Sequence, residues 1–378
     1  ACITSNGSNS PVKAPGRPSA PVSGQNEQRS NHTYRTARTL KRRTAILMPA
    51  VTMLTLLLLL ADMAVGSTSI PLKELWRSLT GNGSDESIRY IILNFRIPKA
   101  VTALLSGAAL SAVGLQMQTL FRNPLAGPYV LGVSSGASLG VALFTLGMPL
   151  LGISASSVWW GGIGAVGAAW AGAALILLVI MAVTTRIKDI MAVLIMGMMF
   201  GSAATAIVEI LQYMSPEGAV KSYVVWTMGS LGGVLLSELR ILVPVLAAGL
   251  ALSVSLIKPL NMLLLGENYA RTMGLDIRAT RLRIFASTIL LAGTVTAYCG
   301  PISFLGLAVP HIVRMAFREA DHRILMPASM VCGGGIMLLC DLASQLPSSD
   351  MTLPINTVTA FIGIPVVIAV IFRTRKNA

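Results

Sequence analysis

The chain has 378 residues, of which 54% are apolar and 12% are charged, and its mean hydropathy is +0.71. Soluble domains carry about twice this share of charged residues, so the composition excludes a soluble globular protein. The net charge is +14 at pH 7, but the basic residues gather beside apolar segments, which argues against nucleic-acid binding. The apolar residues form long continuous runs without period-2 alternation, so they predict an all-α membrane protein and not a β-barrel.

The segment 1–44 differs in composition from the rest of the chain. It is rich in Ser, Asn, Pro and Gly, and holds eight Lys and Arg residues between Lys13 and Arg43 but one acid, Glu27. Such a composition buries too little apolar surface to fold. The first apolar run, Ala45–Val65, lies too far along the chain for a cleavable signal peptide. We predict a disordered basic cytoplasmic tail over 1–44 and a transmembrane domain over 45–376.

Apolar runs long enough to cross a bilayer recur along the chain. They predict ten crossings, over residues 45–65, 98–119, 129–147, 158–184, 190–212, 238–257, 282–299, 303–317, 324–345 and 354–372. With the basic run 41–43 in the cytoplasm, the segments on that side hold 22 of the 29 Lys and Arg residues. This bias obeys the positive-inside rule and places both termini in the cytoplasm.

A long cytoplasmic loop is predicted over residues 258–283. Three leucines, 263–265, lead into a polar, helix-forming stretch that is broken at Gly274. A loop of this length with its own short helices is typical of a docking surface for a partner, and a solvated connector is the alternative.

Three acidic residues fall at membrane depth, Asp62, Glu209 and Asp341. Charged groups there are costly and often functional. Asp62 and Glu209 lie near the outer ends of their helices, where a side chain can reach the interface. Asp341 lies deeper, and both a structural role and a place in a transport pathway remain open for it.

The sequence predicts no catalytic residue, cofactor or metal site. It contains no GxxxxGK[ST] motif, so any ATP that drives this protein is hydrolysed on a partner subunit. His311 and His322 lack the accompanying ligands of a metal site, and we expect them at a cytoplasmic interface.

Several long motifs resemble those of the FecCD-type permeases, the membrane subunits of ABC importers for ferric siderophores, haem and cobalamin. The motifs are RIPKAVTALLSGAALSAVGLQMQTLFRNPLAGPYVLGVSSGASLG (96–140), LLLGENYARTMGLD (263–276), GPISFLGLAVPHIVR (300–314), DHRILMP (321–327) and LPINTVTAFIGIPVV (353–367). They occur in the order of the family and cover about residues 90–370.

The resemblance implies a type II ABC importer permease in the bacterial inner membrane, with ten helices per chain. It implies a homodimer with a pathway between the two copies, two cytoplasmic ATPase subunits and a periplasmic binding protein. The implied ATPase-docking residues are Gly266, Glu267, Tyr269, Ala270 and Gly274.

The resemblance also implies where the binding protein docks. Its acidic residues are expected to meet Arg96 and Lys99, the latter standing where the family has a second Arg. The chain departs from the family twice near the last outer loop. Gln345 stands near the place of an Arg, and Asn356 replaces the Gly of an LPxG motif.

The break at Arg122-Asn123-Pro124 ends a helix, because proline cannot continue the hydrogen-bond ladder. We interpret the Gly/Ser-rich segment that follows, with Gly132 and Gly136, as a hinged, closely packed element near a cytoplasmic gate. A rigid structural turn is the alternative.

The expected function is import of an iron chelate, either a ferric siderophore or haem. Cobalamin is the alternative within the class. An ion-coupled secondary transporter that uses Glu209 or Asp341 as proton carriers is the alternative outside it.

Overall fold

The computed structural model describes the backbone of residues 23–65, 86–152, 158–184, 189–345 and 352–376, together with the single residues Glu74, Arg77 and Ile187. The described residues are helical apart from turns and short connections, and none of them lies in a strand. The chain divides into two units, Ala1–Arg43 and Thr44–Ala378.

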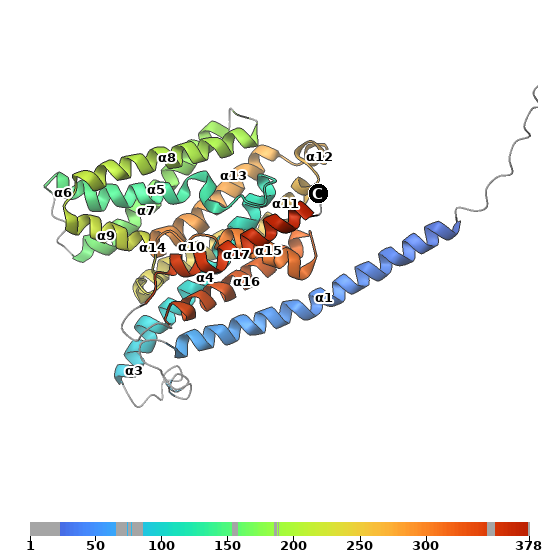
Figure 1. Ribbon diagram of the computed structural model, residues 1–378, viewed down its shortest axis with the longest axis horizontal. Coiled ribbons are helices and arrows are strands. Elements are labelled where there is room, and N and C mark those ends of the chain that lie inside the picture. The colour runs from blue at the N-terminus through green and yellow to red at the C-terminus, as the bar shows by residue number, and fades with distance from the viewer. Residues whose placement is uncertain are drawn as a thin grey trace, which may run out of the picture. The chain divides into compact units, whose positions relative to one another are not determined.

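The helices follow one another in chain order (Figure 1). The α-helices are α1 Ser23–Ala64, α3 Glu86–Ile91, α4 Ile97–Leu120, α5 Val133–Ala142, α6 Met148–Leu150, α7 Val158–Thr184, α8 Ile190–Met214, α9 Glu217–Thr227, α10 Leu236–Ser255, α11 Ile257–Leu264, α12 Glu267–Thr272, α13 Ile277–Thr288, α14 Thr294–Cys299, α15 Leu305–Phe317, α16 His322–Ser344 and α17 Ile355–Lys376. Three π-helical turns, η1 Ile92–Arg96, η3 Leu143–Gly147 and η4 Ile289–Gly293, and one 3-10 turn, η2 Pro128–Leu131, lie between them.

Within the described residues, ten apolar helices correspond to the ten predicted crossings. Eight are long and apolar enough to span a bilayer, and two shorter ones cover Leu305–Phe317 and Ile355–Val370. The prediction of a multi-pass helical membrane protein is therefore confirmed.

Helix α1 begins at Ser23, well before the first predicted crossing. Residues 23–44 are thus helical, which differs from the disorder predicted for them, while residues 1–22 lie outside the described part of the chain. Once an apolar helix has formed, extending it costs little. No proline falls between Ser23 and the crossing to stop that extension.

Helix α4 is the central helix of the second unit. It packs against α15 and α16, and nearly every residue from Ser106 to Leu120 is buried. Glycines allow this contact, because a Cβ on Gly107 would overlap the carbonyl of Gly333, and one on Gly114 would overlap that of Gly306. Small residues of this kind let membrane helices approach backbone to backbone.

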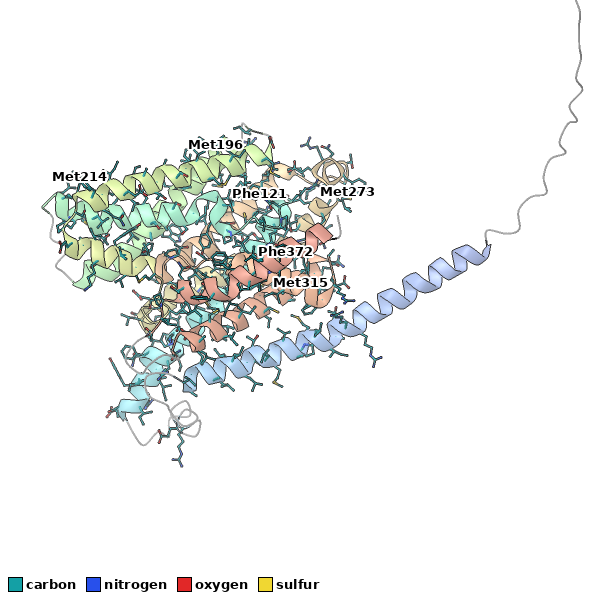
Figure 2. The ribbon with its side chains drawn as sticks, in the orientation of Figure 1. Phe121, Met196, Met214, Met273, Met315 and Phe372 are labelled. Atoms are coloured by element: carbon teal, nitrogen blue, oxygen red, sulfur yellow. The ribbon has the colours of Figure 1, made fainter. Side chains whose placement is uncertain are left out.

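Helices α5, α7 and α8 form a second group, seen side by side in Figure 1. Here Gly136 faces the carbonyl of Gly172, and Gly140 faces that of Ala168. Figure 2 shows Met196 and Met214 on the outward flank of α8, whereas Phe121 is fully buried. Close backbone contact at small residues therefore stabilises both the α4, α15 and α16 group and the α5, α7 and α8 group.

Segments predicted to share one side of the membrane meet in the structure. At the end that we call the inner end, the Asn261 side chain donates to Asp321 at 2.6 Å. At the opposite, outer end, the N–H of Leu353 donates to the carbonyl of Ser344 at 2.9 Å. These contacts agree with the alternation of crossings predicted from charge.

The predicted crossings 282–299 and 303–317 leave a short connection at the outer side of the membrane. In the structure, the connection 300–304 instead lies within the helix bundle. Helix α15 has 13 residues and spans about 20 Å, less than a hydrocarbon core of about 30 Å. It begins where Gly306 touches Gly114, in the middle of α4. The Tyr129 hydroxyl donates to the carbonyl of Ile302 and accepts from its N–H, which satisfies backbone groups that lipid would leave unpaired.

We predict that Gly114→Ala destabilises the protein by about 2–3 kcal/mol or prevents folding, because the methyl group would overlap backbone that has no side-chain freedom to move. Thermal unfolding of the detergent-purified chain measures the effect. Gly167→Ala on α7 is the control, since its Cβ would meet nothing within 4 Å. An unfolding midpoint that Gly114→Ala leaves unchanged contradicts the account of α4 packing.

Candidate functional site

The predicted docking loop is formed by α11 and α12 at the inner end. It presents four exposed apolar side chains to its surroundings, Leu264 (46% exposed), Leu265 (63%), Tyr269 (56%) and Met273 (41%). Figure 2 shows Met273 at this end of the molecule. The opposite face of the docking loop, with Leu260, Leu263 and Ala270, is buried. A rigid loop with a contiguous exposed apolar face is typical of a protein interaction site.

Two glycines define the shape of the loop. Gly266 has φ +116° and leads into α12, and Gly274 has φ +84° and follows it. Side chains other than glycine rarely adopt such angles. The break predicted at Gly274 is confirmed, and both glycines shape the loop without contributing a side chain to its surface.

Glu267 is held by an ion pair within the chain. Its carboxylate pairs with Arg281 of α13 at 2.6 Å, and the Arg281 side chain is only 7% exposed. Asp276 caps α13 by accepting from the N–H of Ala279 at 3.0 Å. Among the five predicted docking residues, Tyr269 and Gly274 are exposed, Ala270 is buried and Glu267 fixes α12 to α13.

Both histidines predicted at a cytoplasmic interface are buried instead. The His322 ring bridges Thr119 of α4 at 2.8 Å and Asn261 of α11 at 2.8 Å. The His311 ring contacts the carbonyl of Pro124 at 2.7 Å. The prediction was wrong because a sequence does not reveal that the ends of α4, α11, α15 and α16 converge here.

Asp321, next to His322, lies just outside the spanning helix. Partial burial alone would raise its pKa, but the N–H of Arg323, the amide of Asn261 and the charge of Arg323 outweigh it. The pKa of Asp321 is therefore below its ordinary value, and the residue accepts hydrogen bonds as a carboxylate at neutral pH.

Four of the predicted gate residues, Arg122, Asn123, Pro124 and Gly132, lie in one connection, 121–132, which we call the gate segment. Asp341, the other pathway candidate, lies on α16. Arg122 has φ +49°, and the Asn123 side chain accepts from the N–H of Leu125 at 2.9 Å. The segment then passes through Pro124 and the turn η2 to Gly132, whose φ is +72°. Gly136 follows one turn later, in backbone contact with α7.

A cavity of about 390 Å³ lies where the gate segment meets α8. Its lining residues are Tyr129, Gly132, Ser135, Gly197, Met198, Gly201, Ser202, Thr205, Ala206 and Glu209. Ser202, Thr205 and Glu209 repeat at helical spacing along one exposed face of α8. Lipid does not favour a polar stripe of this kind, so the stripe is typical of a helix that lines an aqueous route.

This stripe was not predicted from the sequence, where Glu209 was singled out alone. The three- and four-residue spacing of Ser202, Thr205 and Glu209 is the signal that indicates it. The sequence also did not place the gate segment beside α8, because that contact joins residues far apart in the chain.

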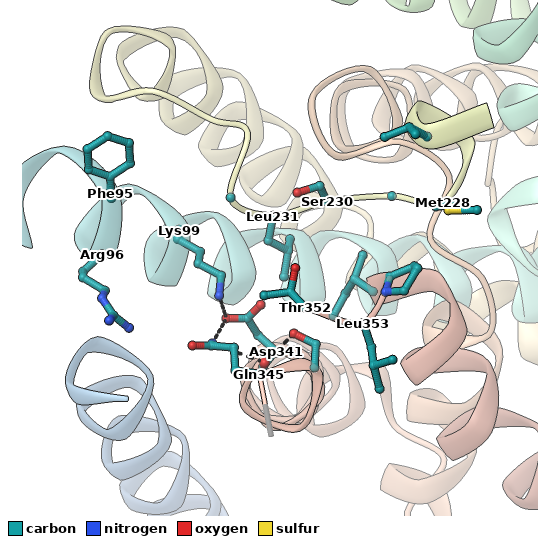
Figure 3. A pocket seen from close by; sticks show the side chains of 16 residues that line it. Phe95, Arg96, Lys99, Met228, Ser230, Leu231, Asp341, Gln345, Thr352 and Leu353 are labelled. Carbon is teal, nitrogen blue, oxygen red and sulfur yellow. Dashed lines mark hydrogen bonds and ion pairs between the residues drawn. The ribbon is translucent and has the colours of Figure 1, made fainter. Parts of the chain in front are cut away.

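A second cavity, of about 480 Å³, opens at the outer end and contains the residues predicted to meet a binding protein (Figure 3). The Lys99 ammonium pairs with Asp341 at 2.7 Å, and the Gln345 amide donates to the same carboxylate at 2.9 Å. Gln345 also reaches Asp62 at 3.5 Å. The Arg96 guanidinium, 8% exposed, donates to the carbonyl of Val65.

These contacts make an internal cluster of two acids and two bases. Buried charges are tolerated when opposite charges and hydrogen bonds compensate them. The structural alternative for Asp341 therefore has a physical basis, and Gln345 is part of the same cluster. Arg96 and Lys99 lie at the predicted place, but their charged groups are engaged within the chain.

Asn356, the other departure from the motif, has a structural role. Its side chain accepts from the N–H of Ser303 at 3.0 Å, and its own N–H donates to the carbonyl of Met228 at 3.3 Å. A glycine would lack the first bond, so this residue anchors the buried connection 300–304.

We predict that Arg281→Glu opens the docking loop, because it places two carboxylates side by side at a half-buried position. Chymotrypsin cleavage after Tyr269 should accelerate about tenfold, since cleavage follows the population of the open form. The double change Glu267→Arg with Arg281→Glu restores the pair and should return the rate close to that of the wild type. Equal rates in all three proteins would show that the pair does not hold the loop.

The fold defines a class, the multi-pass helical membrane proteins. The sequence matches the FecCD transport family over residues 54–373. The chain belongs to this family and is a multi-pass protein of the inner membrane.

Curated relatives cover most of the chain. The vitamin B12 import system permease protein BtuC of Klebsiella pneumoniae is 34% identical over 325 residues, which is 86% of this chain and 93% of that protein. The hemin transport system permease protein HmuU of Yersinia pestis is 32% identical over 329 residues, 85% and 95% of the two chains.

A solved structure shares the fold. It is an inward-facing conformation of an ABC transporter assigned to the metal-chelate type, with a TM-score of 0.75 and 28% identity. The alignment covers 86% of this chain and 99% of that one. The likeness extends over both helix groups, because it spans nearly the whole transmembrane domain.

Proposed function

We propose that this chain is the permease subunit of an ATP-driven importer that moves an iron chelate, a ferric siderophore or haem, from the periplasm to the cytoplasm. The observation that carries the proposal is the docking loop. It is rigidly held at the inner end by the Arg281–Glu267 pair, yet it exposes Leu265 and Tyr269. An exposed apolar face on a loop of fixed conformation suits a partner subunit that binds there and transmits its own movement to the loop.

The proposed partner at this loop is an ATPase subunit. The chain has no P-loop motif of its own, so the energy for transport is supplied by two ATPase subunits, one on each copy of a homodimer. ATP binds to those subunits, and this chain is assigned no cofactor and no enzymatic activity. A periplasmic binding protein is the proposed donor of cargo at the outer cavity, near Arg96 and Lys99.

The proposed pathway runs along the polar stripe of α8. Beside the stripe, Met199 (66% exposed), Ile207 (45%) and Ile210 (61%) form an apolar surface. A second copy of the chain that covers this surface would enclose the stripe between two α8 helices. The cavity at Tyr129 and Gly132 would then open into the shared route.

Cobalamin is the second candidate cargo, and the BtuC relatives favour it as strongly as HmuU favours haem. The lining of the α8 cavity contains hydroxyls, a methionine and one acid, and these groups do not distinguish the two cargoes. The ion-coupled alternative needs Glu209 or Asp341 as a proton carrier. Asp341 is paired with Lys99, so the exposed Glu209 of α8 is the remaining candidate of the two, and the response of uptake to a proton ionophore tests it.

The test is uptake into proteoliposomes that hold this chain with its ATPase and binding protein. Labelled ferric siderophore, haem and cobalamin are offered in turn, with and without ATP in the compartment of the ATPase. We expect ATP-dependent accumulation of an iron chelate, and a proton ionophore should leave it unchanged.

Accumulation of cobalamin alone would replace the cargo and keep the mechanism. Uptake that ignores ATP and collapses with the ionophore would contradict the proposal. The wild-type protein without ATP is the baseline for both comparisons.

A further inference from the structure

Arg122 joins the docking loop to the gate segment. Its guanidinium Nη2 donates to the carbonyl of Leu263, at the end of α11, at 3.2 Å. The same nitrogen lies over Gly266, where a Cβ would approach it to 2.9 Å. Because Gly266 has no side chain, it leaves room for the Arg122 guanidinium. Glycine also permits the φ of +116° at this position.

The beginning of the docking loop is held by a different set of contacts. Asn261 accepts from both the backbone N–H and the ring of His322, at 2.9 and 2.8 Å, and donates to Asp321 at 2.6 Å. His322 is fully buried and also contacts Thr119 of α4. Several buried hydrogen bonds make Asn261 a fixed anchor. The Arg122 contact instead depends on one hydrogen bond, which the exposed Arg122 side chain donates to the Leu263 carbonyl.

The gate segment leads from Arg122 to the wall of the α8 cavity. Pro124 contacts His311 at 2.7 Å, and Tyr129 is hydrogen-bonded to Ile302. Tyr129 and Gly132 then line the cavity. Tyr129, the first cavity-lining residue of the segment, lies seven positions after Arg122, and fixed contacts guide the segment between them.

We infer that Arg122 is the positioning residue that transmits movement of the docking loop to the gate segment. The inference rests on the proposed function. If the docking loop turns about the Asn261 anchor, Leu263 and Gly266 move with it. Because both contact the Arg122 guanidinium, this movement pulls the first residues of the gate segment. Packed side chains and hydrogen bonds between elements with two arrangements can carry such coupling.

The experiment compares Arg122→Ala and Arg122→Lys in the complete complex of permease, ATPase and binding protein. Arg318→Ala is a matched control. Arg318 is also an exposed arginine at the inner end with a positive φ, +55° against +49° for Arg122. Among the described residues, no side-chain hydrogen bond joins Arg318 to the docking loop or the gate segment. Both alanine variants therefore change backbone strain alike.

The readouts are complex assembly, ATP hydrolysis stimulated by the binding protein, and cargo accumulated per ATP. We expect Arg122→Ala to assemble and to hydrolyse ATP but to accumulate about tenfold less cargo per ATP, as the loss of a charge-assisted hydrogen bond implies. Lysine retains a charged donor, so Arg122→Lys should recover a large part of the coupling. Arg318→Ala should match the wild type.

Two results would overturn the inference while leaving the proposed function intact. If Arg122→Ala transports as much cargo per ATP as Arg318→Ala, no coupling passes through the guanidinium. If Arg122→Ala fails to bind the ATPase, the residue is part of the docking surface and not a link behind it. Failure of the wild-type complex to couple transport to ATP would instead contradict the proposed function.

Discussion

The rest of the structure depends on the contact of bare backbone along α4. Gly107 meets Gly333 on α16, and Gly114 meets Gly306 at the start of α15. Within a bilayer, apolar burial gives little preference for one helix neighbour over another, so close packing selects the partners. Because α4 is held in this way, both of its ends have defined positions, with Lys99 at the outer end and Arg122 at the inner end.

Polar side chains secure those two ends in different ways. At the outer end, Lys99 and Arg96 lie among Asp341 and Asp62 in a compensated cluster. At the inner end, neutral hydrogen bonds through His322 and a single guanidinium contact connect α4 to the docking loop. A compensated charge cluster resists rearrangement because separating its members exposes an unpaired charge. At the inner end, one hydrogen bond from the exposed Arg122 side chain joins the docking loop to the gate segment, so this is the end better suited to move.

Much of the fold was predictable because it follows from patterns local in sequence. Hydropathy gave the helices, the distribution of Lys and Arg gave the sides, and Gly274 marked the end of α12. The errors concern contacts between distant residues. The buried state of His322 depends on Thr119 and Asn261, and the α8 cavity depends on Tyr129. The sequence did not indicate that Glu267 pairs with Arg281.

The central claim is that the apolar face of α11 and α12 receives the subunit that supplies energy. A photo-crosslinking residue at Leu265, 63% exposed, tests it in the assembled complex, and one at Tyr213, 92% exposed in the last turn of α8, is the control. We predict that the ATPase subunit is captured from position 265 and not from position 213. Capture from neither position, in a complex that still hydrolyses ATP in response to the binding protein, would contradict the account.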